Sequence, residues 1–366
     1  MSRFRKGAGL VLAVLLVACN GAFETTTSAG EGESDTTTAE MTTTTVASTT
    51  STSLISTTSM PIDGIDLPLA APDTPEWRVL FSVPAGPDGV TYEGGFEDWM
   101  LSGPQALTVA PDGSIWIADT NGRRLLHFAE DGAILTTIDT DDVDVAGLID
   151  IAAVDGSVWG LEVVPALDRH RIVLFDDEGA LIDSHDLPSG LHLRNGLSGI
   201  AAGPDGRLWV ELEGGARVYT TFDSGGEFSP AAVQGYEFQG AILRPLGIED
   251  GMVRFEIGDM IVARPVREQG GITLEGAVPG WVVLLVSDVA FDQAGALTVD
   301  LEVLYADFQG NVAATATYPL DEVAADAYVP QDFIAVAPDG RLIALKPASD
   351  SLDIIQMSLF SAIDEG

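Results

Sequence analysis

The chain has 366 residues, 46% of them hydrophobic, and its 56 acidic residues outnumber its 17 basic ones, for a formal net charge of −39. The hydrophobic fraction predicts a globular core over most of the length, and the charge argues against electrostatic binding of nucleic acid. A single cysteine excludes an intrachain disulfide framework and a cysteine-based zinc site. The acidity has two interpretations, a solvated surface adapted to salt or a site for cations or a basic partner.

The N-terminus has the order of a secretory signal, in which an apolar run too short to span a membrane follows three basic residues, Arg3, Arg5 and Lys6. The run ends in Leu16-Val17-Ala18-Cys19, which resembles the lipobox of bacterial lipoproteins. That resemblance implies acylation of Cys19 and anchoring on the extracytoplasmic side of a membrane of the bacterial cell envelope. The alternative is an ordinary signal peptide with a chance cysteine.

Threonine and serine dominate residues 24–59, which contain almost nothing to bury. Such a segment is typical of a disordered tether, and a coil of this length spans roughly 35 Å. We therefore expect a lipoprotein signal peptide at 1–18, lipidated Cys19 with a linker at 19–60, and one folded domain at 61–366.

An apolar run, a turn ending in glycine and a second apolar run recur six times, at Gly113, Gly156, Gly206, Gly251, Gly295 and Gly340. Successive spacings are 43, 50, 45, 44 and 45 residues, and the copy at Gly251 is the weakest. Turns such as Pro111-Asp112-Gly113 favour chain reversal, because proline presets φ and glycine adopts positive φ. A second hairpin follows in several copies, so that each repeat holds four strands. This pattern predicts an all-β, six-bladed β-propeller rather than an irregular sandwich.

The last repeat has chain for only three strands, whereas residues 77–81 form an apolar run without a partner. We expect this N-terminal strand to complete the last blade, since pairing of this kind removes an open sheet edge.

Residues 104–125 resemble an NHL repeat, a propeller blade that has a proline, an apolar strand, Asp-Gly, Ala-Asp, and then Asn and Arg. The resemblance is strong in the first repeat and weaker in the others, and it covers the chain from about Trp77 to the end. It implies a fold more than an activity, because NHL propellers serve as binding platforms, as sensors and in a few relatives as enzymes. It also implies that Asp119 and Arg123 brace neighbouring strands.

One face of the predicted propeller carries the longer connections and the starts of the innermost strands, and we expect a ligand there. The inner-strand starts carry the candidate channel-mouth residues Gln105, Asp150, Ser198, Asp288 and Asp332. The loops between second and third strands carry the candidate binding residues Asp119, Asn121, Arg123, Glu162, Arg169, Glu211 and Glu213.

Asp150, Asp288 and Asp332 are expected to converge at the channel mouth from three blades, where they could hold a hard cation such as Ca²⁺ with help from Gln105. The alternative is that each aspartate caps a strand start and meets only water or backbone amides. Lactonase-like six-bladed relatives of the gluconolactonase type place a glutamate before Gly-Pro in the first inner strand. Here that place reads Ser102-Gly103-Pro104, which counts against a close analogue.

The four histidines lie apart in the sequence, and we expect none to join a metal cluster or a catalytic triad. No Gly-x-Ser-x-Gly, dinucleotide or P-loop motif occurs. The segment 92–100 contains Phe96 and Trp99, which either pack on the barrel or present aromatic rings to a sugar or peptide.

These observations favour a membrane-anchored, monomeric propeller that acts as a non-catalytic binding or sensing module for a protein, peptide or glycan, with no nucleic-acid partner. The alternative is a metal-dependent, lactonase-like hydrolase with its site at the mouth of the central channel. A purely structural envelope protein is the third hypothesis.

Overall fold

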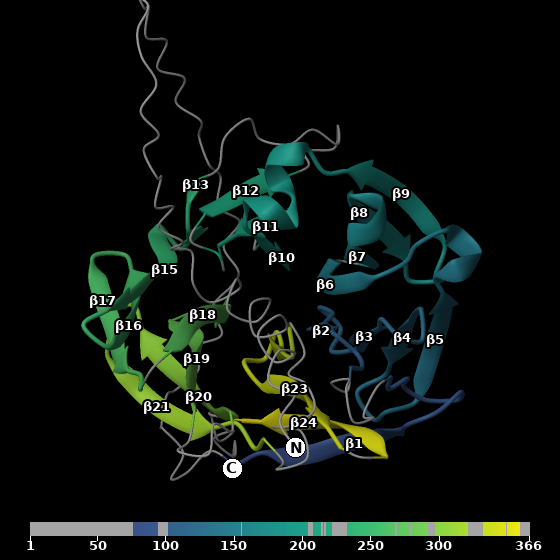
Figure 1. Cartoon of the computed structure of the whole chain (residues 1–366). Helices are drawn as coiled ribbons and strands as arrows, with labels where there is room; N and C mark the ends of the chain where they lie inside the picture. The colour runs from purple at the N-terminus through teal and green to yellow at the C-terminus, as the bar shows by residue number, and fades with distance from the viewer. Residues whose placement is uncertain are drawn as a thin grey trace, which may run out of the picture. The chain divides into compact units, whose positions relative to one another are not determined.

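The computed structural model describes residues 76–93, 102–154, 156–203, 208–213, 215, 217–221, 233–267, 269–278, 280–291, 297–320, 332–348 and 350–358. They form six four-stranded sheets, which Figure 1 shows arranged in a ring. The prediction of an all-β, six-bladed β-propeller is confirmed. The predicted signal peptide, Cys19 and the tether lie outside the described residues. Within the described ranges, no helix is long and apolar enough to cross a membrane.

The first three blades follow each other along the chain. Blade 1 contains β2 (Ala106–Val109), β3 (Ile115–Asp119), β4 (Arg124–Phe128) and β5 (Ile134–Asp139). Blade 2 contains β6 (Leu148–Val154), β7 (Ser157–Val164), β8 (Arg169–Asp176) and β9 (Leu181–Asp186). Blade 3 contains β10 (Leu197–Ala202), β11 (Leu208–Leu212), β12 (Arg217–Thr221) and β13 (Val233–Gln234). Four short 3-10 helices lie in the connections: η1 (Asp141–Val143), η2 (Pro165–Leu167), η3 (Ser189–Leu191) and η4 (Leu193–Asn195).

The other three blades complete the ring, and blade 5 has the longest strands of the described residues. Blade 4 contains β14 (Tyr236–Phe238), β15 (Ala241–Glu249), β16 (Met252–Ile257) and β17 (Met260–Pro265). Blade 5 contains β18 (Gln269–Val278), β19 (Trp281–Phe291), β20 (Leu297–Asp307) and β21 (Val312–Thr317). Blade 6 contains β22 (Ile334–Val336), β23 (Leu342–Pro347), β24 (Ser351–Met357) and the N-terminal β1 (Arg78–Pro84).

The N-terminal strand closes the ring as predicted. β1 runs antiparallel to β24, with a register from Arg78↔Gln356 to Pro84↔Ser351. The inner edge of the same blade meets blade 1, because the backbone N–H of Leu107 donates to the carbonyl of Asp332 at 2.9 Å. Both ends of blade 6 therefore depend on segments that are distant in sequence.

The repeat pattern predicts the correct number of blades. In two blades, however, the glycine that it assigns to the turn between the first and second strands lies between the second and third strands. Gly113 and Gly340, with φ of 87° and 82°, lie between the first and second strands of their blades, as expected. Gly251 instead separates β15 from β16, and Gly295 falls between β19 and β20. Three consecutive strands of blade 5, β18 to β20, are long and rich in apolar residues, so the sequence pattern does not distinguish its first hairpin from its second.

The apolar core lies mainly between neighbouring blades. One buried cluster joins Leu125 of blade 1 to Ile151 of blade 2, and another joins Leu161 of blade 2 to Val210 of blade 3. Each such side chain contributes about 1.5–3 kcal/mol when fully buried. This packing makes the blades a firm scaffold for the strand ends that meet around the axis.

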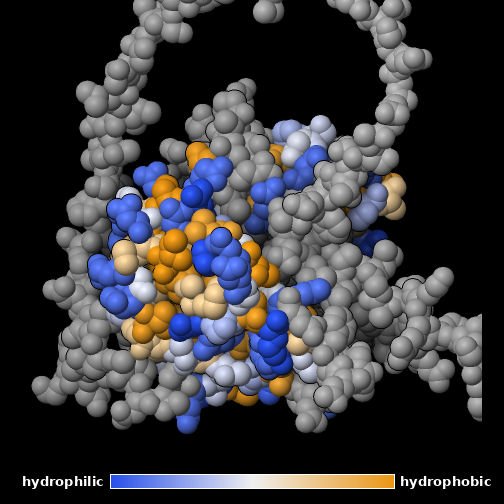
Figure 2. All heavy atoms as spheres, turned by 60° about the vertical axis from the view of Figure 1, so that its left-hand side comes forward, coloured by the Kyte–Doolittle hydropathy of each residue, from blue (hydrophilic) through white to orange (hydrophobic). Residues whose placement is uncertain are grey.

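Blade 4 exposes several large apolar side chains. Its partly exposed apolar side chains include Ile242, Leu246, Ile248, Met260 and Ile261. Figure 2, in which the left-hand side of Figure 1 comes forward, shows apolar residues interspersed with charged ones on this side. These residues belong to the copy that matches the repeat least well.

Candidate functional site

Four carboxyl groups from four different blades interact around the propeller axis. Asp150 lies on β6, Glu211 on β11, Glu275 on β18 and Asp332 directly before β22. Asp150 is almost completely buried and the other three side chains are partly buried. We call these four residues the axial cluster.

Hydrogen bonds hold the axial cluster in place. The two carboxylate oxygens of Asp150 accept the backbone N–H groups of Ile151 and Ile200, each at 2.7 Å. Asp150 and Asp332 are hydrogen-bonded to each other, which requires a proton on one of them. The Thr273 hydroxyl donates to Glu275 at 2.7 Å.

Glu211 is linked to blade 4 through Tyr236. The hydroxyl of Tyr236 donates to the Glu211 carboxylate, and burial raises the pKa of Tyr236 far above its usual value, so that the proton stays on the hydroxyl. Together with the four carboxyl groups, Tyr236 brings oxygen atoms from blades 2 to 6 to the axis.

Gly199 allows two of the carboxylates to approach each other. It stands opposite Glu211 in the β10–β11 pair, on the inner strand of blade 3. A Cβ atom at residue 199 would lie 2.6 Å from Asp150 Oδ2, closer than real side chains tolerate, and in a tight contact of 3.1 Å with Glu211 Oε2. The absence of a side chain on this inner strand therefore gives the carboxylates their space.

Burial and mutual repulsion both favour protons on these groups. Burial, followed by the charge of Glu211, raises the pKa of Asp150 to about 7. Burial raises the pKa of Glu211 to about 6 and that of Glu275 to about 7. The pKa of Asp332 is raised further by burial and by the charge of Asp150. Of the side chains that the structure describes, no basic one pairs with this cluster.

Two other predicted acids are structural braces. Asp119 is completely buried. Its carboxylate accepts hydrogen bonds from Nη2 of Arg124 at 2.7 Å and from the backbone N–H of Thr91 at 3.0 Å. Glu162 is also completely buried and is bound by Arg169 at 2.7 Å and by Arg171. Each acid is thus neutralised within its own blade.

The strand register explains why Glu211 differs from these braces. Asp119 stands opposite Arg124 in the β3–β4 pair, and Glu162 stands opposite Arg171 in the β7–β8 pair. The corresponding partner of Glu211 in the β11–β12 pair is Val218. Glu211 has no cross-strand arginine opposite it and joins the axial cluster instead.

The remaining blade 1 candidates lie outside the cluster. Arg123 was expected to brace strands with Asp119, but this is wrong, because Arg124 fills that role and Arg123 pairs with Asp141 at 2.5 Å. Asn121 donates to the hydroxyl of Ser102 at 2.8 Å. The Gln105 side chain donates to the Gly103 carbonyl, so only its backbone, which accepts the Asp332 N–H at 3.0 Å, touches the cluster.

The prediction that Asp288 reaches the channel mouth is wrong. It lies on β19, the second strand of blade 5, where its carboxylate accepts the backbone N–H and the Nε–H of Arg267 at 2.8 and 2.7 Å. The misplaced turn at Gly295 is the reason, because it made β19 look innermost. Glu275, which the sequence analysis missed, is the acid that blade 5 contributes.

The expectation that no histidine joins a cluster is also wrong in geometry. The rings of His170 and His192 stack with centroids 4.1 Å apart, and Asp168 lies beside them. Between the two histidines the sequence holds the rest of β8, the strand β9 and the short helix η3, so only the fold brings them together.

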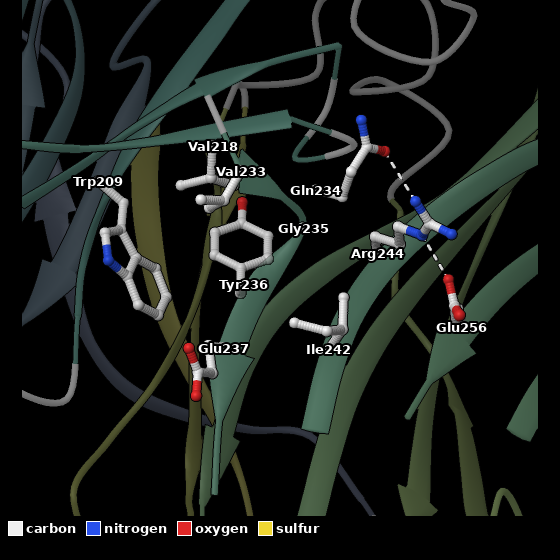
Figure 3. A pocket seen from close by; sticks show the side chains of 10 residues that line it. All are labelled: Trp209, Val218, Val233, Gln234, Gly235, Tyr236, Glu237, Ile242, Arg244 and Glu256. Carbon is white, nitrogen blue, oxygen red and sulfur yellow. Dashed lines mark hydrogen bonds and ion pairs between the residues drawn. The ribbon is translucent and has the colours of Figure 1, made fainter. Parts of the chain in front are cut away.

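A cavity of about 390 Å³ lies between blades 3 and 4 (Figure 3). Trp209 and Tyr236 line it with ring centroids 5.1 Å apart, and Arg244 lies between Gln234 and Glu256, to which it is bonded. Tyr236 thus lines this cavity and is also hydrogen-bonded to Glu211 of the axial cluster. The candidate aromatic residues Phe96 and Trp99 lie outside the described residues.

Comparisons with known proteins identify no family, since no family model matches the chain. Over 156 residues it is 28% identical to Teneurin-1 from Gallus gallus, a match that covers 41% of this chain and 5% of that protein. The chain therefore spans only a small part of this relative.

Similar solved structures include the PQQ-bound aldose sugar dehydrogenase from Streptomyces coelicolor, at 15% identity and a TM-score of 0.44, covering 79% of this chain and 100% of that one. Virginiamycin B lyase from Staphylococcus aureus has 17% identity and a TM-score of 0.35, covering 69% and 94%. Glutaminyl cyclase from Myxococcus xanthus has 13% identity and a TM-score of 0.38, covering 79% and 99%. These likenesses concern the fold alone.

Replacement of a bracing arginine should be far more costly than replacement of its neighbour. Arg124→Gln leaves the buried Asp119 carboxylate without a cation, and we expect a loss of about 3–5 kcal/mol in the free energy of unfolding. Arg123→Gln breaks a pair whose side chains are both about half exposed, so the loss should stay below about 1 kcal/mol. Denaturant unfolding of the two variants measures both values, and equal losses would contradict the bracing role.

The axial cluster should make stability depend on pH. Because the folded carboxyl groups have pKa values of about 6 to 7, the folded protein holds protons that the unfolded chain releases between about pH 4 and about pH 7. The free energy of unfolding should therefore decrease as pH rises through this window and level off above it.

The control for this pH dependence separates the cluster from overall charge. In EDTA, Glu275→Gln should reduce the difference between the melting temperatures at about pH 5 and about pH 8, whereas the exposed Glu178→Gln should not. Equal behaviour of the two variants would show that general acidity, rather than the cluster, causes the effect.

Proposed function

We propose that this chain is a lipid-anchored, extracytoplasmic propeller that acts as a non-catalytic binding module, with a hard divalent cation of the Ca²⁺ type as the ligand of the axial cluster. The observation that carries the proposal is the electrostatic interaction of four carboxyl groups from four blades without a basic partner among the described side chains. Their oxygens are not within 4.8 Å of one another in any group of three, so a cation would have to draw them together. A buried group of this kind needs either protons or a cation, because unpaired charges are costly away from water.

The donor atoms favour a hard cation. The cluster offers carboxylate oxygens from Asp150, Glu211, Glu275 and Asp332, and the Tyr236 hydroxyl beside them adds another oxygen. Ca²⁺ takes six to eight oxygen ligands in flexible geometry, and Mn²⁺ also accepts such donors. A bound cation would replace the protons that the cluster otherwise holds.

Two features of blade 1 support binding rather than catalysis. Its repeat resembles those of NHL propellers, which serve mainly as binding platforms, and its acid Asp119 is neutralised by Arg124. The residue before Gly103-Pro104 is Ser102, where lactonase-like propellers have a glutamate, and its hydroxyl accepts a hydrogen bond from Asn121. The metal-dependent hydrolase remains the alternative, and it requires the same axial cation.

Calorimetric titration of Ca²⁺ and Mn²⁺ into the detergent-solubilised full chain at about pH 8, where the carboxyl groups are ionised, tests the proposal. One site per chain is expected, and the double variant Asp150→Asn/Glu275→Gln should lose more than about 100-fold in affinity. Asp288→Asn is the matched control, because Arg267 already holds that carboxylate.

Absent binding, or weak multisite binding that the double variant does not change, would exclude the axial cation. Calcium-dependent turnover of lactones or esters, lost in the same variant, would replace the binding module with the hydrolase. Thermal unfolding of each variant shows that the fold is intact.

The anchor is tested separately from the ligand. Cys19→Ser removes the thiol that would be acylated, so the protein should move from the membrane fraction to the soluble fraction after expression in a bacterium, and the acyl mass on the N-terminal peptide should disappear. Ala13→Ser in the apolar run is the control and should leave the membrane fraction unchanged. Retention of Cys19→Ser in the membrane would contradict lipid anchoring.

A further inference from the structure

Three potential metal ligands meet at the connection between blades 2 and 3, apart from the axial cluster. Asp168 ends η2, His170 lies on β8, and His192 stands between η3 and η4. One ligand atom from each lies within 4.8 Å of the other two. Both histidines are more than nine-tenths buried, whereas two-thirds of the Asp168 side chain is exposed.

The hydrogen bonds of His192 direct a free nitrogen toward Asp168. Its Nε2 lies 3.2 Å from the Leu187 carbonyl, which can only accept, so this nitrogen carries the proton. Its Nδ1 has no hydrogen-bond partner and lies 3.5 Å from Asp168 Oδ1. With the proton on Nε2, Nδ1 is the ring nitrogen that faces the Asp168 carboxylate, and a cation between Nδ1 and Oδ1 would bind both atoms.

The backbone holds the two histidines in place without a ligand. The N–H of Leu187 donates to the His170 carbonyl at 2.8 Å, and the N–H of Asn195 donates to the His192 carbonyl at 2.8 Å. A metal-bound histidine usually donates its second N–H to a carbonyl, as His192 does to Leu187, which fixes the ring orientation.

The basic side chain between Asp168 and His170 in the sequence is already engaged. Arg169 pairs with buried Glu162 at 2.7 Å and approaches Asp144 at 3.5 Å. Its charge is thus balanced by two carboxylates other than Asp168.

We propose that Asp168, His170 and His192 bind a divalent transition metal ion, Zn²⁺ in the first place. Two imidazole nitrogens and one carboxylate oxygen suit Zn²⁺ better than Ca²⁺, which prefers oxygen alone. Ligand atoms around tetrahedral Zn²⁺ lie roughly 3.4 Å apart. Nδ1 of His192 and Oδ1 of Asp168 are already 3.5 Å apart, and because all three ligand atoms lie within 4.8 Å of one another, the others need to close by at most about 1.4 Å. Three protein ligands leave a fourth position for water or for an atom of a bound molecule.

Titration of the full chain with Zn²⁺ by calorimetry and with Co²⁺ by visible absorption tests the site. One ion per chain is expected, with affinity reduced at least about 100-fold in His192→Ala and at least about 10-fold in Asp168→Asn. His185→Ala is the matched control: this histidine lies on β9 of blade 2, beside Asp183 at 2.8 Å, and its loss should change the affinity less than about threefold.

We expect His192→Ala to lose stability because His192 is buried. The decisive variant is therefore Asp168→Asn, since the Asp168 side chain is mostly exposed. Zn²⁺ should also raise the melting temperature of the wild type but not that of the variants. The proposal fails if the wild type binds neither ion stoichiometrically, or if Asp168→Asn binds Zn²⁺ as tightly as the wild type. It also fails if Asp150→Asn removes Zn²⁺ binding while His192→Ala does not, because the ion would then occupy the axial cluster.

Discussion

A buried carboxylate needs a positive partner, a proton or a metal ion, and this constraint organises the acids of the propeller. At the ends of the second strands of blades 1 and 2, Asp119 and Glu162 meet arginines from the neighbouring strand and brace their sheets. Around the axis, Asp150, Glu275 and Asp332 have no such partner among the described side chains. Acidic residues therefore brace the sheets where an arginine is available, and hold protons or a cation where none is.

Glu211 shows how one cross-strand substitution changes the role of an acid. In blades 1 and 2 an arginine stands opposite the acid, whereas Val218 stands opposite Glu211. Gly199 on the inner strand then admits its carboxylate beside Asp150. Tyr236 is hydrogen-bonded to Glu211 and also lines the cavity between blades 3 and 4, so a ligand in that cavity would contact a residue that is bonded to the axial cluster.

The sequence predicts the blade number and the closure by β1, because both depend on local turn signals and on strand count. Asp150 and Asp332 were identified because Gly156 and Gly340 do lie between the first and second strands of their blades, which places the two aspartates at the innermost strands. Glu275 was missed because three strands of blade 5 are all rich in apolar residues. The spacing of the repeats therefore does not tell which of these strands is innermost. The pairing of His170 with His192 depends on how two connections approach each other, and local sequence does not encode that distance.

The axial carboxyl groups should stay protonated at pH values at which ordinary carboxyl groups are ionised. An infrared titration of the full chain in EDTA tests this expectation most directly, through the C=O band of protonated carboxyl groups. We expect this band to persist at about pH 6, well above the usual carboxyl pKa of about 4. The band should weaken in Asp332→Asn and on addition of Ca²⁺, which displaces the protons. Complete loss of the band below about pH 5, with no difference between the wild type and Asp332→Asn, would contradict this expectation.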